Sequence, residues 1–208
     1  MFIYTPSLTL QNVNIRDVGA VGTSVQFPMW LHVNTLLIES VQILNMAAGT
    51  RIMTILPWDD TQDSSLTLTD VSFSNNNDMQ KAKGMFSLDF ESANVTISGL
   101  TLSNNTASAN VLSINITTGN LMVSESRILD NVINNPTSTA CVYVEGGALH
   151  MSNITTHNGN NQQNFDNPVI QTICNATANC ILEDLVLEGD CVLLQSQNSP
   201  MGTMLRNV

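Results

Sequence analysis

The stretch Leu8-Thr9-Leu10-Gln11-Asn12-Val13-Asn14-Ile15 decides the fold, because its pattern returns along the whole chain. Apolar residues alternate with polar ones on both sides of Asn12, and two residues instead of one separate Leu10 from Val13. Clear copies occupy residues 36–43, 66–73 and 95–102, and three weaker copies follow them. Period-2 alternation predicts two short strands that each bury one face. The extra residue shifts the phase, so the chain must turn a corner there.

The spacing of the copies predicts the architecture. The second apolar position of each copy serves as its anchor, and the anchors are Leu10, Ile38, Leu68, Ile97, Val123, Met151 and Leu182. Their spacings are 28, 30, 29, 26, 28 and 31 residues, and each repeat carries a third apolar segment, such as 52–56 or 111–116. A near-constant repeat of short strands is typical of a solenoid. We therefore predict an all-β, single-stranded parallel β-helix, one domain over residues 1–208, with about seven coils of about 28 residues and three short strands per coil.

Two polar columns follow the anchors and indicate where the coils bend. Two residues after the anchors stand Asn12, Ser40, Asp70, Gly99, Glu125, Asn153 and Asp184. Seven residues after them stand Asp17, Asn45, Asn75, Asn104, Asp130, Asn158 and Gly189. Asn, Asp and Gly tolerate the left-handed backbone of a corner. The second column has two interpretations: a hydrogen-bonded ladder of stacked side chains, or separate turns that each favour these residues.

The last residues, 203–208, repeat the start of the pattern with Leu205 in the anchor position. We interpret the chain as a segment of a longer solenoid whose open ends continue into further coils or self-associate. Covering of those ends by neighbouring copies is the other interpretation.

Composition narrows the classes of function. The net charge is −11, with only 6 Lys and Arg residues among 208. This balance excludes the basic surface of a nucleic-acid binder and disfavours anionic membranes. No apolar run approaches the about 18 residues of a membrane span. The sequence also contains no phosphate loop, dinucleotide fingerprint or zinc spacing, so we expect no cofactor and no metal.

Five asparagines fit the N-glycosylation sequon Asn-x-Ser/Thr. Asn94 and Asn115 alternate with inward residues and are expected to point outward, Asn153 occupies a corner, and Asn175 lies in an expected loop. Asn104 is the doubtful site, because it belongs to the possible ladder. A chain rich in Asn and Thr also forms sequons by chance, so that alternative stays open.

The four cysteines all lie in the last third of the chain. Cys174 and Cys180 close a short loop and are the expected disulfide. Cys141 and Cys191 begin equivalent strands about two coils apart, which places them too far apart for a direct bridge. The alternative for some of these residues is a small apolar side chain buried in the core.

Few residues suggest catalysis. Asp59 and Asp60 follow Trp58 in a loop, and paired carboxylates supply the acid and base of glycoside hydrolysis. A solvated acidic loop or a weak Ca²⁺ site is the alternative. His150 and His157 flank a corner, but His150 is expected to point outward, so the pair does not converge on a metal.

The columns, corners and Asn-rich turns resemble the right-handed parallel β-helix superfamily, the pectin-lyase-like fold, over nearly the whole chain. That resemblance implies a polysaccharide lyase or glycoside hydrolase as one possible function. Pectin-degrading members use Asp clusters with nearby Arg or Lys. Their Asn-Thr-Asp, Gly-His-Gly and Arg-Ile-Lys signatures are missing here, and residues 127–129 read Arg-Ile-Leu.

A second resemblance is to polymorphic outer-membrane proteins, through residues 146–149 (Gly-Gly-Ala-Leu) and 73–76 (Phe-Ser-Asn-Asn). It implies a role in surface adhesion or architecture. We therefore expect a non-enzymatic, extracellular or cell-surface structural or adhesive module, glycosylated and part of a larger surface protein or filament. The alternative is the polysaccharide-degrading enzyme. A lectin-like binder is a third option and requires an exposed aromatic platform, for which Trp30 and Trp58 are the only tryptophans.

Overall fold

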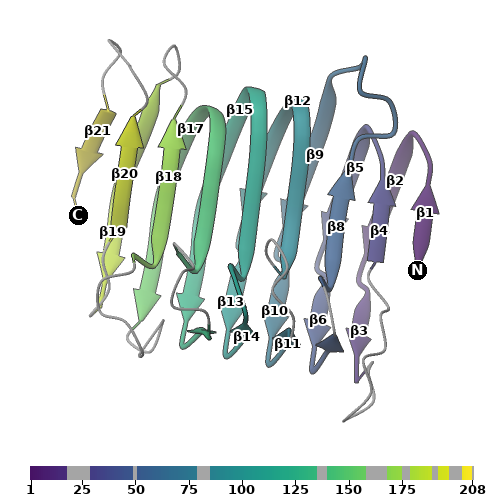
Figure 1. The fold of residues 1–208 in the computed structure, drawn as a ribbon, viewed down its shortest axis with the longest axis horizontal. Helices are drawn as coiled ribbons and strands as arrows, with labels where there is room; N and C mark the ends of the chain where they lie inside the picture. Colours follow the sequence, from purple (N-terminus) through teal and green to yellow (C-terminus); the bar gives the residue numbers. More distant parts are fainter. Residues whose placement is uncertain are drawn as a thin grey trace.

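The chain winds into a stack of parallel coils whose axis runs along the length of the molecule (Figure 1). The computed structural model describes residues 1–17, 29–48, 51–78, 85–134, 140–157, 168–174, 179–188, 192–196 and 203–207. All regular structure in these residues is β-strand. The strand order follows the sequence from β1 at one end of the stack to β21 at the other (Figure 1). The predicted all-β parallel solenoid with coils of about 28 residues is confirmed.

Three walls enclose the coils. Wall A contains β1 (Phe2–Tyr4), β4 (Met29–His32), β8 (Met53–Leu56), β18 (Ile170–Cys174) and β20 (Val192–Ser196). Wall B contains β2 (Ser7–Gln11), β5 (Thr35–Glu39), β9 (Ser64–Thr69) and β21 (Thr203–Arg206), and wall C contains β3 (Asn14–Arg16), β6 (Gln42–Leu44), β10 (Ser72–Ser74) and β13 (Thr101–Ser103). Longer strands run around the corners and belong to more than one wall: β12 (Phe86–Ser98), β15 (Leu112–Leu129), β17 (Val142–His157) and β19 (Cys180–Leu187).

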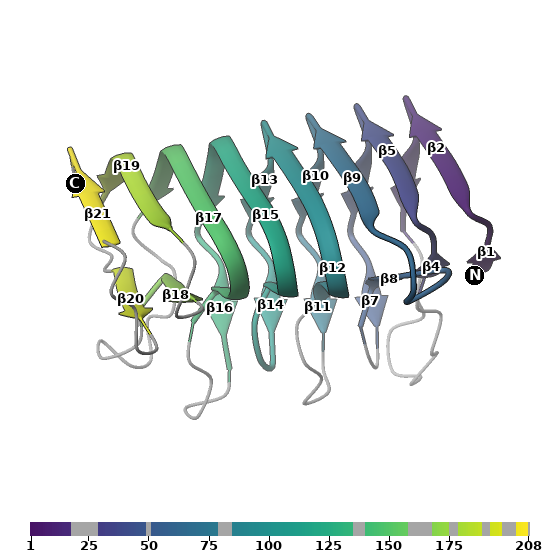
Figure 2. The ribbon, with the colours of Figure 1, turned by 90° about the horizontal axis from the view of Figure 1, so that it is seen from above.

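The anchor column stacks in register through the described coils. Leu10 pairs with Ile38, Ile38 with Leu68, and Leu68 with Ile97. The series continues through Val123, Met151 and Leu182 to Leu205. Wall B therefore presents its strands side by side from β2 to β21 (Figure 2). Each coil places its inward residues above those of its neighbour, as the repeat predicted.

The first polar column forms left-handed corners between walls B and C. Every member of this column has positive φ, as does Asn207 in the last copy, with values between 51° and 69°. The second column is also left-handed where it is described, at Asp17, Asn45, Asn75, Asn104 and Asp130. Asn158 and Gly189 lie outside the described residues. Both predicted corners are thus confirmed, even at Ser40 and Glu125, whose residue types do not favour this backbone.

A fourth short strand follows the second corner in the middle coils, beyond the three that the sequence predicted. These strands are β7 (Ala47–Ala48), β11 (Asn77–Asp78), β14 (Thr106–Ala107) and β16 (Val132–Ile133), which pair as a separate parallel sheet (Figure 2). Each is only two residues long, which is too short for alternation of apolar residues to show in the sequence.

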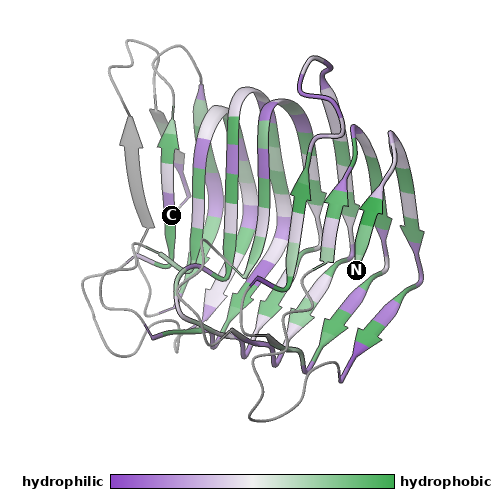
Figure 3. Cartoon of the chain, turned by 45° about the vertical axis from the view of Figure 1, so that its right-hand side comes forward, coloured by the Kyte–Doolittle hydropathy of each residue, from purple (hydrophilic) through white to green (hydrophobic). Residues whose placement is uncertain are grey.

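One continuous hydrophobic core fills the inside of the coils. Apolar and polar residues alternate along the strands (Figure 3), and the alternating apolar residues are the buried ones. Ile97 and Leu102 are fully buried, whereas Thr96 between two inward residues is exposed. In the first coil, Leu8, Leu10 and Ile15 are only half-buried and pack against the core from one side. The core is therefore an axial stack of small layers and not one globular interior.

Candidate functional site

A buried asparagine ladder connects the coils just inside the second corner. Asn76, Asn105 and Asn131 are almost fully buried, and each lies eight residues after its anchor. The Asn76 side-chain amide donates to Asn105 Oδ1 at 3.0 Å, and the Asn105 amide donates to Asn131 Oδ1 at 2.9 Å. Each ladder oxygen also accepts a backbone N–H from the preceding coil, at Met46, Asn76 and Asn105.

The ladder nitrogens also donate to backbone carbonyls of the preceding coil. Asn76, Asn105 and Asn131 donate to the carbonyls of Ile43, Phe73 and Leu102. The sequence had placed a possible ladder one residue earlier, at the column that contains Asn104. That placement is wrong for Asn104, which is exposed at the left-handed corner while its neighbour Asn105 enters the ladder. The earlier column forms a direct side-chain bond between Asn45 and Asp17, at 3.0 Å.

The sequons lie on the outside of the coils where they are described. Asn94, Asn104 and Asn153 are exposed, and Asn153 occupies its predicted left-handed corner. Asn115 is half-buried on wall A, where its amide donates to Asp89 Oδ1 at 2.9 Å. Asn175 lies outside the described residues. The four described positions therefore present their side chains to the surface and not to the core.

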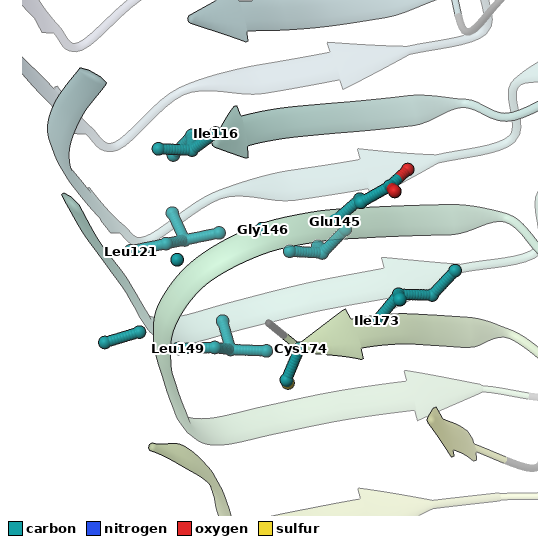
Figure 4. Close-up of a pocket in the computed structure, with 10 residues that line it drawn as sticks. Ile116, Leu121, Glu145, Gly146, Leu149, Ile173 and Cys174 are labelled. Carbon is teal, nitrogen blue, oxygen red and sulfur yellow. The ribbon is translucent and has the colours of Figure 1, made fainter. Parts of the chain in front are cut away.

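The corner between walls A and B is closed by glycine in one coil and by a disulfide in the next. Gly146 has φ of 126°, and a Cβ atom there would collide with the carbonyl oxygen of Ile116. Apolar side chains fill the inside of this corner, while Glu145 points away from it (Figure 4). In the following coil Cys174 stands beside Gly146, and the predicted bond between Cys174 and Cys180 is present.

The other two cysteines, Cys141 and Cys191, each directly precede a strand in the sequence. Cys141 is fully buried and directly precedes β17. Cys191 lies outside the described residues. The first residues of β17 and β20 are two rungs apart, because Val142 pairs with Ile170 and Ile170 with Val192. The two strands themselves, β17 and β20, therefore lie two coils apart.

The Asp59–Asp60 loop is held by hydrogen bonds that occupy Asp59. Its carboxylate accepts the Thr61 backbone N–H at 2.9 Å and the Thr61 hydroxyl at 2.7 Å. Gln62 donates to the other oxygen at 3.2 Å. These bonds lower the pKa of Asp59, with the Thr61 hydroxyl as the largest cause. Asp59 is therefore an ionised turn-forming residue, the opposite of the protonated carboxyl that a general acid needs.

The two histidines that flank the Asn153 corner contact separate carboxylates. His150 contacts Glu183 at 2.8 Å on wall B, and Glu183 also lies 3.8 Å from Arg206. His157 lies 3.3 Å from Asp130 and 3.6 Å from Glu188. Within the described residues no three His, Cys, Asp or Glu side chains gather as metal ligands.

A shallow groove of about 410 Å³ runs over the outer face of wall B. Its outward-facing lining consists of Asn94, Thr96, Asn120, Met122, Ala148, His150, Asn179 and Ile181. Within this lining Asn120 donates to Asn94 Oδ1 at 2.8 Å. The described lining contains no carboxylate.

On wall A, Tyr143 donates a hydrogen bond to Glu145 at 2.7 Å. Burial of the Tyr143 hydroxyl, together with this hydrogen bond to a charged acceptor, raises the pKa of Tyr143 to about 12.

Aromatic side chains gather on the outer face of wall A near its first strands. Phe2 stacks beside Trp30 with ring centroids 6.2 Å apart. Tyr4 contacts His32 at 4.9 Å and Trp58 at 4.0 Å. Phe2 and Tyr4 are 77% and 63% exposed, so the cluster faces solvent. Sequence reasoning named the two tryptophans but did not bring them together.

Comparison with protein-family models, curated proteins and solved structures finds no match to this chain. The described part of the chain contains no helix of the length and apolarity needed to cross a membrane.

Proposed function

We propose that this chain is a non-enzymatic structural module of an extracellular or cell-surface protein, in which the solenoid serves as a rigid scaffold. The observation that carries the proposal is the buried ladder of Asn76, Asn105 and Asn131, which joins successive coils along the axis. The side-chain amides of the ladder form hydrogen bonds between neighbouring coils. These bonds join the same coils that the anchor column joins, along the axis of the solenoid. In a solenoid each added repeat contributes its own stability and one more coil-to-coil interface, which suits a long continuous scaffold.

Two features support an extracellular setting. The Cys174–Cys180 disulfide forms and persists where the surroundings are oxidising. The described sequon asparagines, Asn94, Asn104, Asn115 and Asn153, lie at the surface, where a glycan needs no rearrangement of the core. A glycosylated outer surface on a stack of parallel coils suits a filament, sheath or adhesive stalk built by self-association or from further coils of the same kind.

The pectin-lyase-like superfamily is the fold family we propose for the chain, on the strength of its parallel walls and Asn-rich corners. A polysaccharide lyase or glycoside hydrolase is the alternative function within that fold. Asp59 and Asp60 would be its carboxylates. The turn-forming role of Asp59 and the absence of carboxylates from the described lining of the wall B groove favour the structural role.

Secretion from a glycosylating eukaryotic cell followed by glycopeptide mass spectrometry tests the surface part of the proposal. Glycans are expected at two or more of Asn94, Asn104, Asn115, Asn153 and Asn175. Secreted, folded protein with every sequon unmodified would remove the glycosylated surface from the proposal. Incubation with polygalacturonate and with neutral polysaccharides tests the enzymatic alternative. New reducing ends or unsaturated products that disappear in Asp59→Asn or Asp60→Asn would overturn the structural role.

A further inference from the structure

The aromatic cluster of Phe2, Tyr4, Trp30, His32 and Trp58 is a surface that the structural role does not use. Phe2 and Trp30 occupy paired positions of β1 and β4, and so do Tyr4 and His32. Trp58 arrives from the loop that leaves β8 and passes above the neighbouring strands (Figure 1). Three separate parts of the chain thus converge, and they leave rings exposed that a monomeric protein normally covers.

The loop that carries Trp58 is fixed in place by one buried side chain. Asn34 is only 6% exposed, and its Oδ1 accepts the backbone N–H groups of Trp58 at 2.8 Å and Asp59 at 3.1 Å. Its amide donates to the Asp59 carbonyl at 3.3 Å and to Gln62 Oε1 at 3.5 Å. The Trp58 ring is therefore presented by a preorganised loop, which lowers the entropy cost of binding a ligand.

The charges around the rings have one sign. Asp59, Asp60 and Asp63 follow Trp58 within the same loop, and Asp60 and Asp63 are exposed. The strands β1, β4 and β8 and residues 57–63 contain no Lys or Arg. The hydrogen bonds from Thr61 and Gln62 lower the pKa of Asp59 below its usual range, so its carboxylate is negatively charged at neutral pH. The Asp59 carboxylate is bonded within the loop, and Asp63 accepts the Ser92 hydroxyl at 2.6 Å. Exposed Asp60 has no side-chain partner among the described residues. The acidic loop that carries Trp58 therefore favours a cationic ligand over an anionic one.

We propose that the aromatic cluster and the Asp59–Asp63 loop form a docking site for a partner segment that presents arginine side chains. A guanidinium group stacks flat on an exposed Trp, Tyr or Phe face and pairs with a carboxylate at its edge. Tyr, Trp and Arg are also the residues that most often dominate the energy of protein interfaces. The partner is a different, basic molecule and not a second copy, because this chain has only 6 Lys and Arg residues.

Intrinsic fluorescence reads this site directly, because Trp30 and Trp58 are the only tryptophans of the chain and both belong to it. The full chain is titrated with an arginine-glycine repeat peptide, with the matched lysine peptide, and with a neutral oligosaccharide, cellohexaose. A saturable fluorescence change with the arginine peptide is expected, and it weakens about tenfold in Kd when the salt is raised from low to near-molar concentration. The lysine peptide binds more weakly, because ammonium does not stack.

Two variants retain both tryptophans and change the site. Tyr4→Ala is expected to weaken binding of the arginine peptide about fivefold, and Asp60→Asn about threefold. Met122→Ala is the matched control, since Met122 is an exposed apolar side chain on wall B, and it leaves Kd unchanged. Circular dichroism confirms that each variant is folded.

Three results would overturn the proposal. Equal binding of the arginine and lysine peptides that Tyr4→Ala does not weaken would show attraction to net charge alone. Binding of cellohexaose without binding of the arginine peptide would make the cluster a glycan platform, the lectin-like option. Absence of any saturable change with the arginine peptide in folded protein would leave the rings without this ligand.

Discussion

Replacement of Asn105 by alanine is the sharpest perturbation of the coil stack. Asn105 is fully buried in the middle of the ladder. Its Oδ1 accepts both the backbone N–H and the side-chain amide of Asn76, each at 3.0 Å. Its own amide donates to the Phe73 carbonyl and to Asn131 Oδ1, both at 2.9 Å. Alanine removes all four bonds while it keeps the backbone conformation.

The expected cost follows from the partners that remain inside the core. The Asn76 backbone N–H loses its acceptor, and the Phe73 carbonyl loses the side-chain donor. Asn76 retains a bond to Ile43, and Asn131 Oδ1 retains the backbone N–H of Asn105. The Phe73 carbonyl keeps its backbone partner in β13, so only one buried group, the Asn76 N–H, is left without a partner. The loss of this partner lowers the free energy of unfolding by about 1–3 kcal/mol. A typical domain has about 5–15 kcal/mol of stability, so the change is large.

Urea denaturation followed by circular dichroism, on protein made without glycans, measures this difference. Amide hydrogen exchange adds a local reading, because the Asn76 N–H is expected to lose protection. Asn104→Gly is the matched control: Asn104 is exposed and left-handed, and glycine adopts that backbone without strain, so its effect stays within about 0.5 kcal/mol. A loss below about 1 kcal/mol for Asn105→Ala, with the Asn76 amide still protected, would refute the ladder as a stabilising element.

Four further changes test other parts of the structure. Gly146→Ala is expected to reduce the midpoint of urea denaturation strongly, because the added Cβ meets a backbone carbonyl at φ of 126°. Replacement of Cys174 and Cys180 together by alanine lowers the free energy of unfolding by about 2 kcal/mol, from the lost constraint on a short loop. Tyr143 is expected to ionise near pH 12 in a spectrophotometric titration, so its contribution to stability is complete below pH 10 and is lost as the pH rises toward 12. Ile97→Asp buries a charge in the anchor column and is expected to abolish soluble, cooperatively folded protein.

Each of these four predictions has a matched control or a result that would contradict it. Thr96→Asp places the same charge on the exposed side of the strand and leaves folding intact; soluble Ile97→Asp would mean that the columns are misassigned. Glu145→Gln removes the charged acceptor and brings the Tyr143 titration to lower pH. Ala148→Gly, on the same strand, is the control for Gly146→Ala. Equal midpoints of urea denaturation for wild type and Gly146→Ala would contradict the corner geometry. Unchanged stability of the double cysteine variant would deny the disulfide a stabilising role.

The strand walls and corners were predictable from sequence because the repeat supplies several aligned samples of each position. Ser40 and Glu125 show the strength of that alignment. Neither residue type indicates a left-handed corner by itself, and only their place in the column predicts it.

The ladder was missed by one residue for an equally physical reason. Its column reads Met46, Asn76, Asn105 and Asn131 among the described coils, so only part of it carries the amide. Asn75 and Asn104 stand directly before two of its members and give the earlier column a stronger sequence signal. The doublets Asn75-Asn76 and Asn104-Asn105 indicate both positions in the sequence. The first asparagine of each doublet forms the left-handed corner and the second enters the ladder.

The aromatic cluster required the fold. Phe2 and Trp30, like Tyr4 and His32, are 28 residues apart, one repeat length, but the first strand was not aligned with the third segments of later coils. Trp58 enters from a loop that has no counterpart in the pattern, and its position depends on four hydrogen bonds of Asn34. The hydrogen bonds of Asn34 occur only once along the described coils, so no repeated sequence pattern predicts them.

The most direct test of the structural role is a density map of the complete glycosylated protein in its native setting. We predict that the coils belong to a larger stack of parallel coils, formed with a second subunit or with further coils in register with the anchor column, and that glycan density lies on the outer walls. Strand edges that bear an unrelated cap, with bare sequons and a polysaccharide bound beside Asp59 and Asp60, would contradict it.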